Sequence, residues 1–468
     1  MPILVVVLAL LVGGGIADRA ARRRPAASLG TTAPALMPTA APGDAMSSTW
    51  YCAGATAAPG SAAIGTVVLA NTRSRPVEGT VTAITVGGGT RTVPVRVDPL
   101  SVTGVNLSQI APSPFAAAVV ELNAGQVAAE LFVTGARADD VTPCASAASQ
   151  QWYFADGSTA RDAGLTLALF NPFPDDAIAD LSFSTDQGRA APSDLEGIIV
   201  PARGLVVRNI GDHVRRREAV STEVDVRRGR LVAAQTQTRT APGRAGLSVV
   251  LGAPSLGLEW YFPDGLVADG VVERFSVANP SSREARVLVE VNLDEGAAEP
   301  FELTIPPRDR IGLVLNQESR IPKGVGHATT VRSLNGVPVV AARSTEAATA
   351  SRSGRTDTLG ARRPAPAWVF AVGGASGELD ETVVVQNPGT RPAQVSFTGL
   401  AAGRRLAIDG LQRLTIPPGR RLAVRIAEHA TRAQLPLVVR SSRPVLAERS
   451  LHHPGATGLS MTMGIPLA

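Results

Sequence analysis

The stretch WYFPDG, residues 260–265, brings three large aromatic side chains together in a chain that is poor in aromatic residues. Near copies occur at three other places, as WYCAG from Trp50, WYFADG from Trp152 and WVFAVGG from Trp368. The four copies contain all four tryptophans and all three tyrosines of the 468-residue sequence. Their spacings of 102, 108 and 108 residues indicate a tandem repeat.

Two further landmarks recur in step with the aromatic motif. An apolar run that ends in asparagine follows each tryptophan by 19 to 21 residues, and the four asparagines are Asn71, Asn171, Asn279 and Asn387. A run that ends in proline, such as LTIPPRD or LTIPPGR, follows further on. Asparagine and proline between apolar runs predict a strand, a turn and a strand, because proline fixes φ and asparagine hydrogen-bonds its own backbone. With about seven short strands per repeat, the turn spacing is typical of a β-sandwich.

The composition favours the same class of fold. Hydrophobic residues make up 44% of the chain but aromatic residues only 4%, and 46 glycines and 35 prolines interrupt it throughout. We expect an all-β protein of four tandem immunoglobulin-like β-sandwich repeats of about 100 residues, after an N-terminal apolar segment. A four-bladed propeller fits less well, because a blade needs only about 40 to 50 residues. The expected divisions are 1–24, a signal peptide or membrane anchor; 25–47, a Pro/Ala-rich linker; and repeats over 48–148, 149–256, 257–364 and 365–468.

The N-terminal segment predicts export. Residues 3–17, ILVVVLALLVGGGIA, would rise about 22 Å as a helix, whereas a membrane core is roughly 30 Å thick. This length favours a signal-peptide core, and Gly15 and Ala17 form a small-x-small cleavage pattern. Against it, no basic residues precede the run, and the arginines of DRAARRRP follow it, where the positive-inside rule would keep them in the cytoplasm. A cleaved signal and a membrane anchor both remain open, so the expected location is the extracytoplasmic face of the cell membrane or the medium.

The aromatic motif is expected to supply the core of each repeat. Side chains alternate across an extended Trp-Tyr-Phe, so Trp and Phe share one face and Tyr takes the other. The expected core residues are Trp50, Trp152, Trp260, Trp368, Phe154, Phe262 and Phe370. The tyrosines, Tyr51, Tyr153 and Tyr261, are then free to touch a neighbour or a ligand, and Val369 in the fourth copy predicts that the last repeat lacks this contact.

Both cysteines belong to the first repeat. Cys52 takes the place of the phenylalanine of the motif, and Cys144 lies 94 residues after Trp50, where the second repeat opens its last strand at Gly246. If the first and last strands of a repeat are neighbours, these residues form a disulfide. Closing a loop of this length would stabilise the fold by up to about 4 to 5 kcal/mol and would suit an oxidising compartment.

The sequence contains little that predicts catalysis. His213 and His429 occupy equivalent positions in different repeats, and the adjacent His452 and His453 should face opposite ways on a strand, so we expect no metal site. The acidic pair at Asp139 is expected in a turn. No nucleophile elbow, phosphate-binding glycine loop or zinc motif is present. We therefore expect no catalytic residue, no cofactor and no enzyme.

The aromatic motif, with glycine three residues on and an apolar run ending in Asn-Pro, is similar to repeats of exported bacterial surface proteins. The whole layout resembles an uncharacterised actinobacterial family of secreted or membrane-anchored proteins with such WYF/Asn-Pro repeats. The resemblance covers nearly the whole chain and implies export, but it brings no catalytic residue. The first copy departs from the pattern with Cys for Phe and Asn-Thr for Asn-Pro, and the fourth with Val for Tyr.

We therefore predict a non-enzymatic cell-envelope scaffold or binding protein that is exported and membrane-tethered. The net charge is +5, and its arginine clusters, such as 215–217, suit anionic cell-wall polymers as partners. Another envelope protein is the other expected partner, with the membrane reached through the N-terminus and no nucleic acid bound. The alternative is an exported enzyme, or an accessory subunit, that acts on envelope polysaccharide at a repeat junction. Convergent Asp, Glu or His in a junction pocket would favour that alternative.

Overall fold

The computed structural model describes residues 38–58, 63–135, 139–376, 379–454 and 457–467. Antiparallel sheets dominate these residues, and the one α-helix is the single turn α2 (Leu107–Ile110). The expected all-β class with sheets packed as sandwiches is confirmed. The expected signal peptide or anchor over 1–24 lies outside the described residues. None of the helices in the described ranges has the length and hydropathy needed to span a membrane.

The first repeat shows the plan of the other three. One sheet has the order β1 (Ser48–Ala55), β6 (Ala116–Leu122), β3 (Val77–Thr85) and β4 (Thr90–Val97). The second has the order β5 (Ser101–Asn106), β2 (Ile64–Asn71), β7 (Val127–Thr134) and β8 (Asp139–Pro143). The repeat thus holds eight strands rather than about seven, and the strand missed in the sequence is the alanine-rich β6.

The remaining repeats keep this strand order. In the second repeat, one sheet has the order β9 (Gln151–Phe154), β15 (Val220–Arg228), β11 (Ala177–Thr185) and β12 (Gly188–Ala190), and β13 (Ile198–Val200) also pairs with β11. The other sheet has the order β14 (Gly204–Asn209), β10 (Ala163–Asn171), β16 (Val232–Arg239) and β17 (Gly246–Leu251). In the third, the sheets are β18 (Glu259–Phe262), β23 (His327–Ser333), β20 (Ala285–Leu293), β21 (Phe301–Ile305), and β22 (Asp309–Val314), β19 (Val271–Asn279), β24 (Val340–Ala348), β25 (Ser353–Leu359).

In the fourth repeat, one long strand, β32 (Leu437–His452), serves both sheets. Its first half pairs with β26 (Ala365–Phe370) and β28 (Ala393–Ala401), and its second half pairs with β27 (Asp380–Gln386) and β33 (Leu459–Met463). The short strands β29 (Arg404–Ala407), β30 (Leu414–Ile416), β31 (Arg421–Arg425) and β34 (Ile465–Pro466) complete the sheets.

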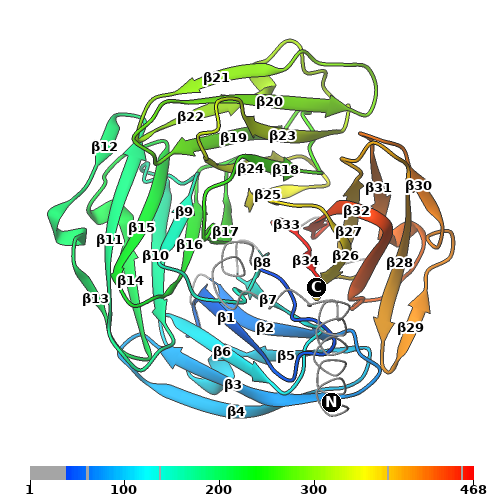
Figure 1. Cartoon of the computed structure of the whole chain (residues 1–468), viewed down its shortest axis with the longest axis horizontal. Helices are drawn as coiled ribbons and strands as arrows, with labels where there is room; N and C mark the ends of the chain where they lie inside the picture. The colour runs from blue at the N-terminus through cyan, green and yellow to red at the C-terminus, as the bar shows by residue number, and fades with distance from the viewer. Residues whose placement is uncertain (1–37, 59–62, 136–138, 377–378, 455–456, 468) are drawn as a thin grey trace, which may run out of the picture.

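The four sandwiches form a closed ring with β8, β17, β25 and β33 at its centre (Figure 1). Each of these central strands packs against the central strands of the repeats before and after it, so the fourth repeat returns to the first. The two ends of the described chain meet at this closure, where the amide of Ala40 donates to the carbonyl of Pro466 at 2.9 Å. The ring has no free end among its sandwiches.

The tryptophans anchor the interior of each sandwich. All four have at most 2% of their surface exposed, and Phe154, Phe262 and Phe370 are buried as well. The indole nitrogens of Trp152, Trp260 and Trp368 each donate to a main-chain carbonyl at 2.9 Å, those of Leu231, Val339 and Val445. Burying a ring of this size supplies about 5 kcal/mol in an interior otherwise built of Val, Leu and Ala.

The recurring asparagines tie the two sheets of each sandwich together. Asn279 is fully buried, and its Nδ2 donates to the carbonyls of Arg283, Ile305 and Pro306, while its Oδ1 accepts from the amide of Ser281. Its counterparts Asn71, Asn171 and Asn387 make the same set of bonds. The asparagine after one strand therefore holds the proline-terminated end of another, which explains why the two landmarks recur together.

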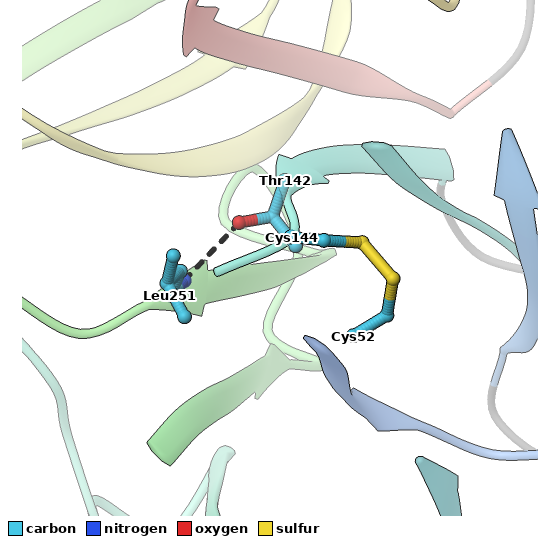
Figure 2. Close-up of a disulfide and its surroundings, with 4 residues drawn as sticks. All are labelled: Cys52, Thr142, Cys144 and Leu251. Carbon is cyan, nitrogen blue, oxygen red and sulfur yellow. Dashed lines mark hydrogen bonds between the residues drawn. A yellow bond between two sulfur atoms is a disulfide. The ribbon is translucent and has the colours of Figure 1, made fainter. Parts of the chain in front are cut away.

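The disulfide between Cys52 and Cys144 is present, as predicted. Their Cα atoms lie 4.5 Å apart, and Figure 2 shows the bond running from β1 to the residues that follow β8. Beside it, the amide of Tyr51 donates to the carbonyl of Ala145 at 2.8 Å. The same backbone bridge joins Tyr153 to Ala253 and Tyr261 to Ala361. The disulfide therefore reinforces a closure that other repeats make with hydrogen bonds alone.

The tyrosines of the motif reach into the following repeat. The ring of Tyr51 lies 6.4 Å from that of Phe173, and Tyr153 is buried in the core of the third repeat. Val369 is fully buried against the core of the first repeat. The expectation that the last repeat lacks this contact is wrong, because the closed ring places the first repeat beside the fourth and the smaller side chain is still covered.

Replacing Asn279 with alanine is expected to lower the free energy of unfolding by at least about 2 kcal/mol, because three carbonyls and one amide would lose their partner in the interior. Asn292→Ala is the matched control, since this asparagine is exposed on β20, and its effect should stay within about 0.5 kcal/mol. Urea denaturation of the two variants measures the difference. Equal midpoints would show that the buried asparagine is not a structural tie.

Candidate functional site

The central strands are held to one another by side chains. In each contact, a short polar side chain of one strand accepts a hydrogen bond from a main-chain amide of the next strand around the ring. The four bonds are Asp140 Oδ2 from Val249 at 2.7 Å, Ser248 Oγ from Asp357 at 2.9 Å, Thr356 Oγ1 from Met461 at 3.0 Å, and Ser460 Oγ from Val141 at 3.0 Å. Because the last bond returns to the first strand, the four form a closed cycle.

Thr142 adds a second bond at the first junction. Its Oγ1 accepts from the amide of Leu251 at 3.1 Å, close to the disulfide at Cys144, as Figure 2 shows. At the third junction, Thr358 makes the corresponding contact in the other direction, with its hydroxyl donating to the carbonyl of Met461 at 2.7 Å. At two of the four junctions, the central strands are therefore joined by a second side-chain hydrogen bond.

The acidic pair at Asp139 lies in β8 and not in a turn, so the sequence expectation was wrong there. Asp140 is buried, with its carboxylate accepting from the amides of Val141 and Val249. Burial raises the pKa of this carboxyl to about 8, and the charge of the nearby Asp357 acts in the same direction. The central strand of the first repeat therefore holds a carboxyl group whose pKa lies well above that of an ordinary aspartic acid.

Buried ion pairs join the third repeat to the fourth and the fourth to the first, besides the pair of Asp156 in the second repeat with Arg355 in the third. Arg343 of the third repeat contacts Glu448 of the fourth at 2.5 Å, and Arg449 of the fourth contacts Glu130 of the first at 3.2 Å. All four side chains are fully buried. Their only signal in the sequence is a charged residue within an apolar strand, as in VAAEL, VVAARS and VLAERS. The apolar pattern predicts these strands, but it does not place their charged residues at the junctions.

A cavity of about 210 Å³ opens where the four central strands end. Each repeat contributes to its wall, through 141–143, 249–255, 357–365 and 462–464. Pro38 and Thr39, the first residues described, also line it. Most of the lining is apolar or small, and its charged residues are Arg362, Arg363 and Asp357. All four repeats thus contribute to one common cavity.

Arg362 is held rigidly at the rim. Its guanidinium carbon lies 5.1 Å from the centre of the Trp260 ring, and its Nη1 donates to the carbonyl and the hydroxyl of Ser255 at 3.0 Å. Burial, and then the charge of Arg363, lower the pKa of Arg362. Arg363 itself is exposed. Two adjacent arginines thus contribute to the lining of a mainly apolar cavity.

A second cleft, of about 370 Å³, lies at the junction of the fourth repeat with the first. Nε2 of His453 is 2.8 Å from Oδ2 of Asp139, and burial raises the pKa of this carboxyl. Ser460 lines the same cleft, but its hydroxyl already accepts from Val141. His213 and His429 do not share a site with this pair. Over the described parts of the chain, no group of three or more His, Cys, Asp or Glu is arranged to hold a metal ion.

Comparison with known proteins gives a family match and weak structural likenesses. The model of a family of unknown function, DUF5719, matches residues 123–309, and no curated protein matches the chain. The crystal structure of Thermotoga maritima 1070 is 22% identical with a TM-score of 0.21, covering 23% of this chain and 94% of that one. The Anabaena sensory rhodopsin transducer is 22% identical with a TM-score of 0.17, covering 19% and 81%.

A third similar structure, Streptomyces avermitilis alpha-L-rhamnosidase complexed with L-rhamnose, is 10% identical with a TM-score of 0.15, covering 72% of this chain and 44% of that one. The family match agrees with the expected similarity to an uncharacterised family.

Asp140 is expected to make stability depend on pH. Its pKa is higher in the folded protein than in the unfolded chain, so its contribution is present at acid pH and is lost as pH rises through about 8. The free energy of unfolding should therefore fall between about pH 4 and pH 8, by at most about 1.4 kcal/mol per pH unit from this group, and should level off above the folded pKa. Asp140→Asn should flatten the profile.

The matched control is Asp409→Asn, at an exposed position between β29 and β30. Thermal unfolding measured at several pH values in one buffer series compares the three proteins. If the Asp140→Asn profile stays parallel to that of the unmodified protein, the central carboxyl is not the titrating group.

Proposed function

We propose that the protein is a non-enzymatic binding protein of the cell envelope, in which a rigid ring of sandwiches presents basic surface to anionic polymers. The closed ring carries this proposal. Its junctions are filled by buried ion pairs and by the cycle of hydrogen bonds at the centre, so the four repeats form one fixed surface. Such an assembly suits a scaffold better than an enzyme that must open and close.

Several observations support export and tethering. The disulfide between Cys52 and Cys144 suits an oxidising compartment. The apolar run at 3–17 precedes the described chain, which begins at the centre of the ring with Pro38. The resemblance to secreted or membrane-anchored actinobacterial proteins remains a prediction that agrees with these features. Together they support a location on the extracytoplasmic face of the membrane, with anionic wall polymers or another envelope protein as the partner.

The exposed arginines at Arg215 and Arg216 are the expected polymer contacts. They follow a 3-10 turn (Ile210–Asp212) in the second repeat and lie on the surface. An arginine guanidinium recognises carboxylate or phosphate through paired hydrogen bonds, which suits repeated acidic units. This surface lies apart from the central cavity, which none of these residues lines.

The full chain in detergent should be retained on immobilised cell-wall polysaccharide at low salt and should elute as salt rises toward 1 M, because the Debye length falls to about 3 Å. Replacing both Arg215 and Arg216 with glutamine should lower the eluting salt concentration. The matched control replaces the exposed Gln412 and Gln394 with asparagine, which leaves the charge unchanged. Complete flow-through of the unmodified protein at low salt would rule out polymer binding.

A second candidate, an enzyme at a repeat junction, is favoured by one observation, the pairing of Asp139 with His453 inside the cleft of about 370 Å³. The enzymatic alternative is tested with protein retained on the immobilised polysaccharide. Soluble sugar released from the polysaccharide by the unmodified protein, and not by His453→Ala, would establish the enzymatic alternative. Retention without release would support the binding function.

A further inference from the structure

Two arginines that line the central cavity, Arg362 and Arg363, have no carboxylate partner among the described residues, and the one carboxylate in its lining, Asp357, is paired with Arg355. The bonds of Arg362 go to an indole ring and to the two oxygens of Ser255. Only burial and a second arginine perturb its ionisation, with no acidic group contributing. Within the described ranges, no ion pair connects Arg362 or Arg363 to Asp or Glu.

Fully buried arginines elsewhere in the ring are always paired. Arg343 and Arg449 contact glutamates, Arg239 contacts Asp162 at 2.9 Å, and Arg355 contacts Asp357 at 2.6 Å. Each of these fully buried arginines therefore has a carboxylate partner, whereas the half-buried Arg362 and the exposed Arg363 have none among the described residues. The unmatched pair at the cavity leaves room for an anion from outside the chain.

The equivalent positions of the other repeats show that the fold does not need this charge. Arg362 and Arg363 follow Ala361, which forms the backbone bridge to Tyr261. After the corresponding bridges, the first repeat has Ser146 and Ala147, and the second has Pro254 and Ser255. These repeats close in the same way with small residues. The arginines are thus specific to the wall of the cavity.

The first described residues of the chain do not supply the missing anion. Pro38 and Thr39 line the cavity, and neither carries a carboxylate. Asp44, the next acidic residue along the chain, does not line the cavity.

The size and lining of the cavity define the rest of the ligand. A volume of about 210 Å³ is below the roughly 300 to 1,000 Å³ of sites for drug-sized ligands. Leu251, Leu359 and Met463 contribute apolar wall beside Ala365. A short hydrocarbon chain fits these walls, whereas a length of polysaccharide does not.

We propose that the central cavity binds a small anionic amphiphile, with its phosphate or carboxylate group held by Arg362 and Arg363 and its short apolar chain enclosed among the ends of the central strands. This site is separate from the polymer-binding surface and does not depend on it. The two anionic groups differ in source, since a phosphate would come from a lipid-type phosphoester and a carboxylate from a fatty acid.

Calorimetric titration of the full chain in a non-ionic detergent tests the proposal with four probes. Hexyl phosphate and hexanoate carry both parts of the ligand, hexanol carries only the chain, and inorganic phosphate carries only the anion. At least one of the two anionic amphiphiles should bind about tenfold more tightly than either partial probe, and whichever binds more tightly identifies the anionic group. Equal binding of hexanol, or of inorganic phosphate, would overturn the proposal.

Variants then assign the binding to the cavity. Arg363→Ala removes an exposed side chain and should weaken binding of the preferred amphiphile about tenfold, as expected for loss of a charge-assisted bond. Ala365→Leu should fill part of the cavity and weaken amphiphile binding while leaving that of inorganic phosphate unchanged. Arg405→Ala is the matched control, because it removes one of two adjacent exposed arginines on β29, away from the cavity.

Undiminished binding by Arg363→Ala would place the ligand elsewhere and would overturn the assignment. Thermal unfolding of each variant without ligand shows whether it is folded. The polysaccharide column separates this proposal from the proposed function, since Arg363→Ala should elute at the same salt concentration as the unmodified protein. A loss of both activities in this variant would show that the polymer, not a small amphiphile, occupies the cavity.

Discussion

The whole ring depends on how four edge strands meet at its centre. The strands at the centre, β8, β17, β25 and β33, each pair with a neighbouring strand on one side only. On the other side, each carries main-chain amides that face the buried centre of the ring without a partner strand. An amide left unpaired there would cost about 1 to 3 kcal/mol. The side chains of Asp140, Ser248, Thr356 and Ser460 satisfy these amides, each across the boundary to the next repeat. The hydrogen bonds that satisfy the edge amides are thus the same bonds that close the ring.

The junctions differ from one another in the side chain that occupies one equivalent position in each repeat. Register in the ladders makes Leu131, Gln235, Arg343 and Arg449 equivalent residues of the four repeats. Only the last two are charged, and each faces a glutamate of the following repeat. A buried ion pair adds little net stability, but an unpaired member is costly. We therefore interpret these pairs as specificity devices, which make the third, fourth and first repeats dock in one order rather than exchange places.

The sequence predicts what is repeated locally, and it does so for a physical reason. Trp260 and its counterparts fill each core, and the asparagines bond within their own sandwich, so periodicity alone reveals them. The sequence does not predict the strand β6, because FAAAVVEL has few β-branched residues and its copies, such as HATTVRS, share no landmark with it. Asp140 was misread because Asp-Asp ordinarily marks a turn, whereas here the acidic side chain bonds to a repeat more than 100 residues away.

The central cavity could not be inferred from any local pattern, because it is assembled from four segments that only ring closure brings together. Its arginines nevertheless leave a trace in the sequence, as a departure from the repeat. Where the first repeat has Ser146, which accepts a bond from the amide of Thr39, the third has Arg362. A symmetric ring offers equivalent surfaces four times over, and a single-copy ligand site requires that symmetry to be broken. The break lies where all four repeats meet Pro38 and Thr39, so one bound anion would contact the third repeat while its apolar chain touches the others.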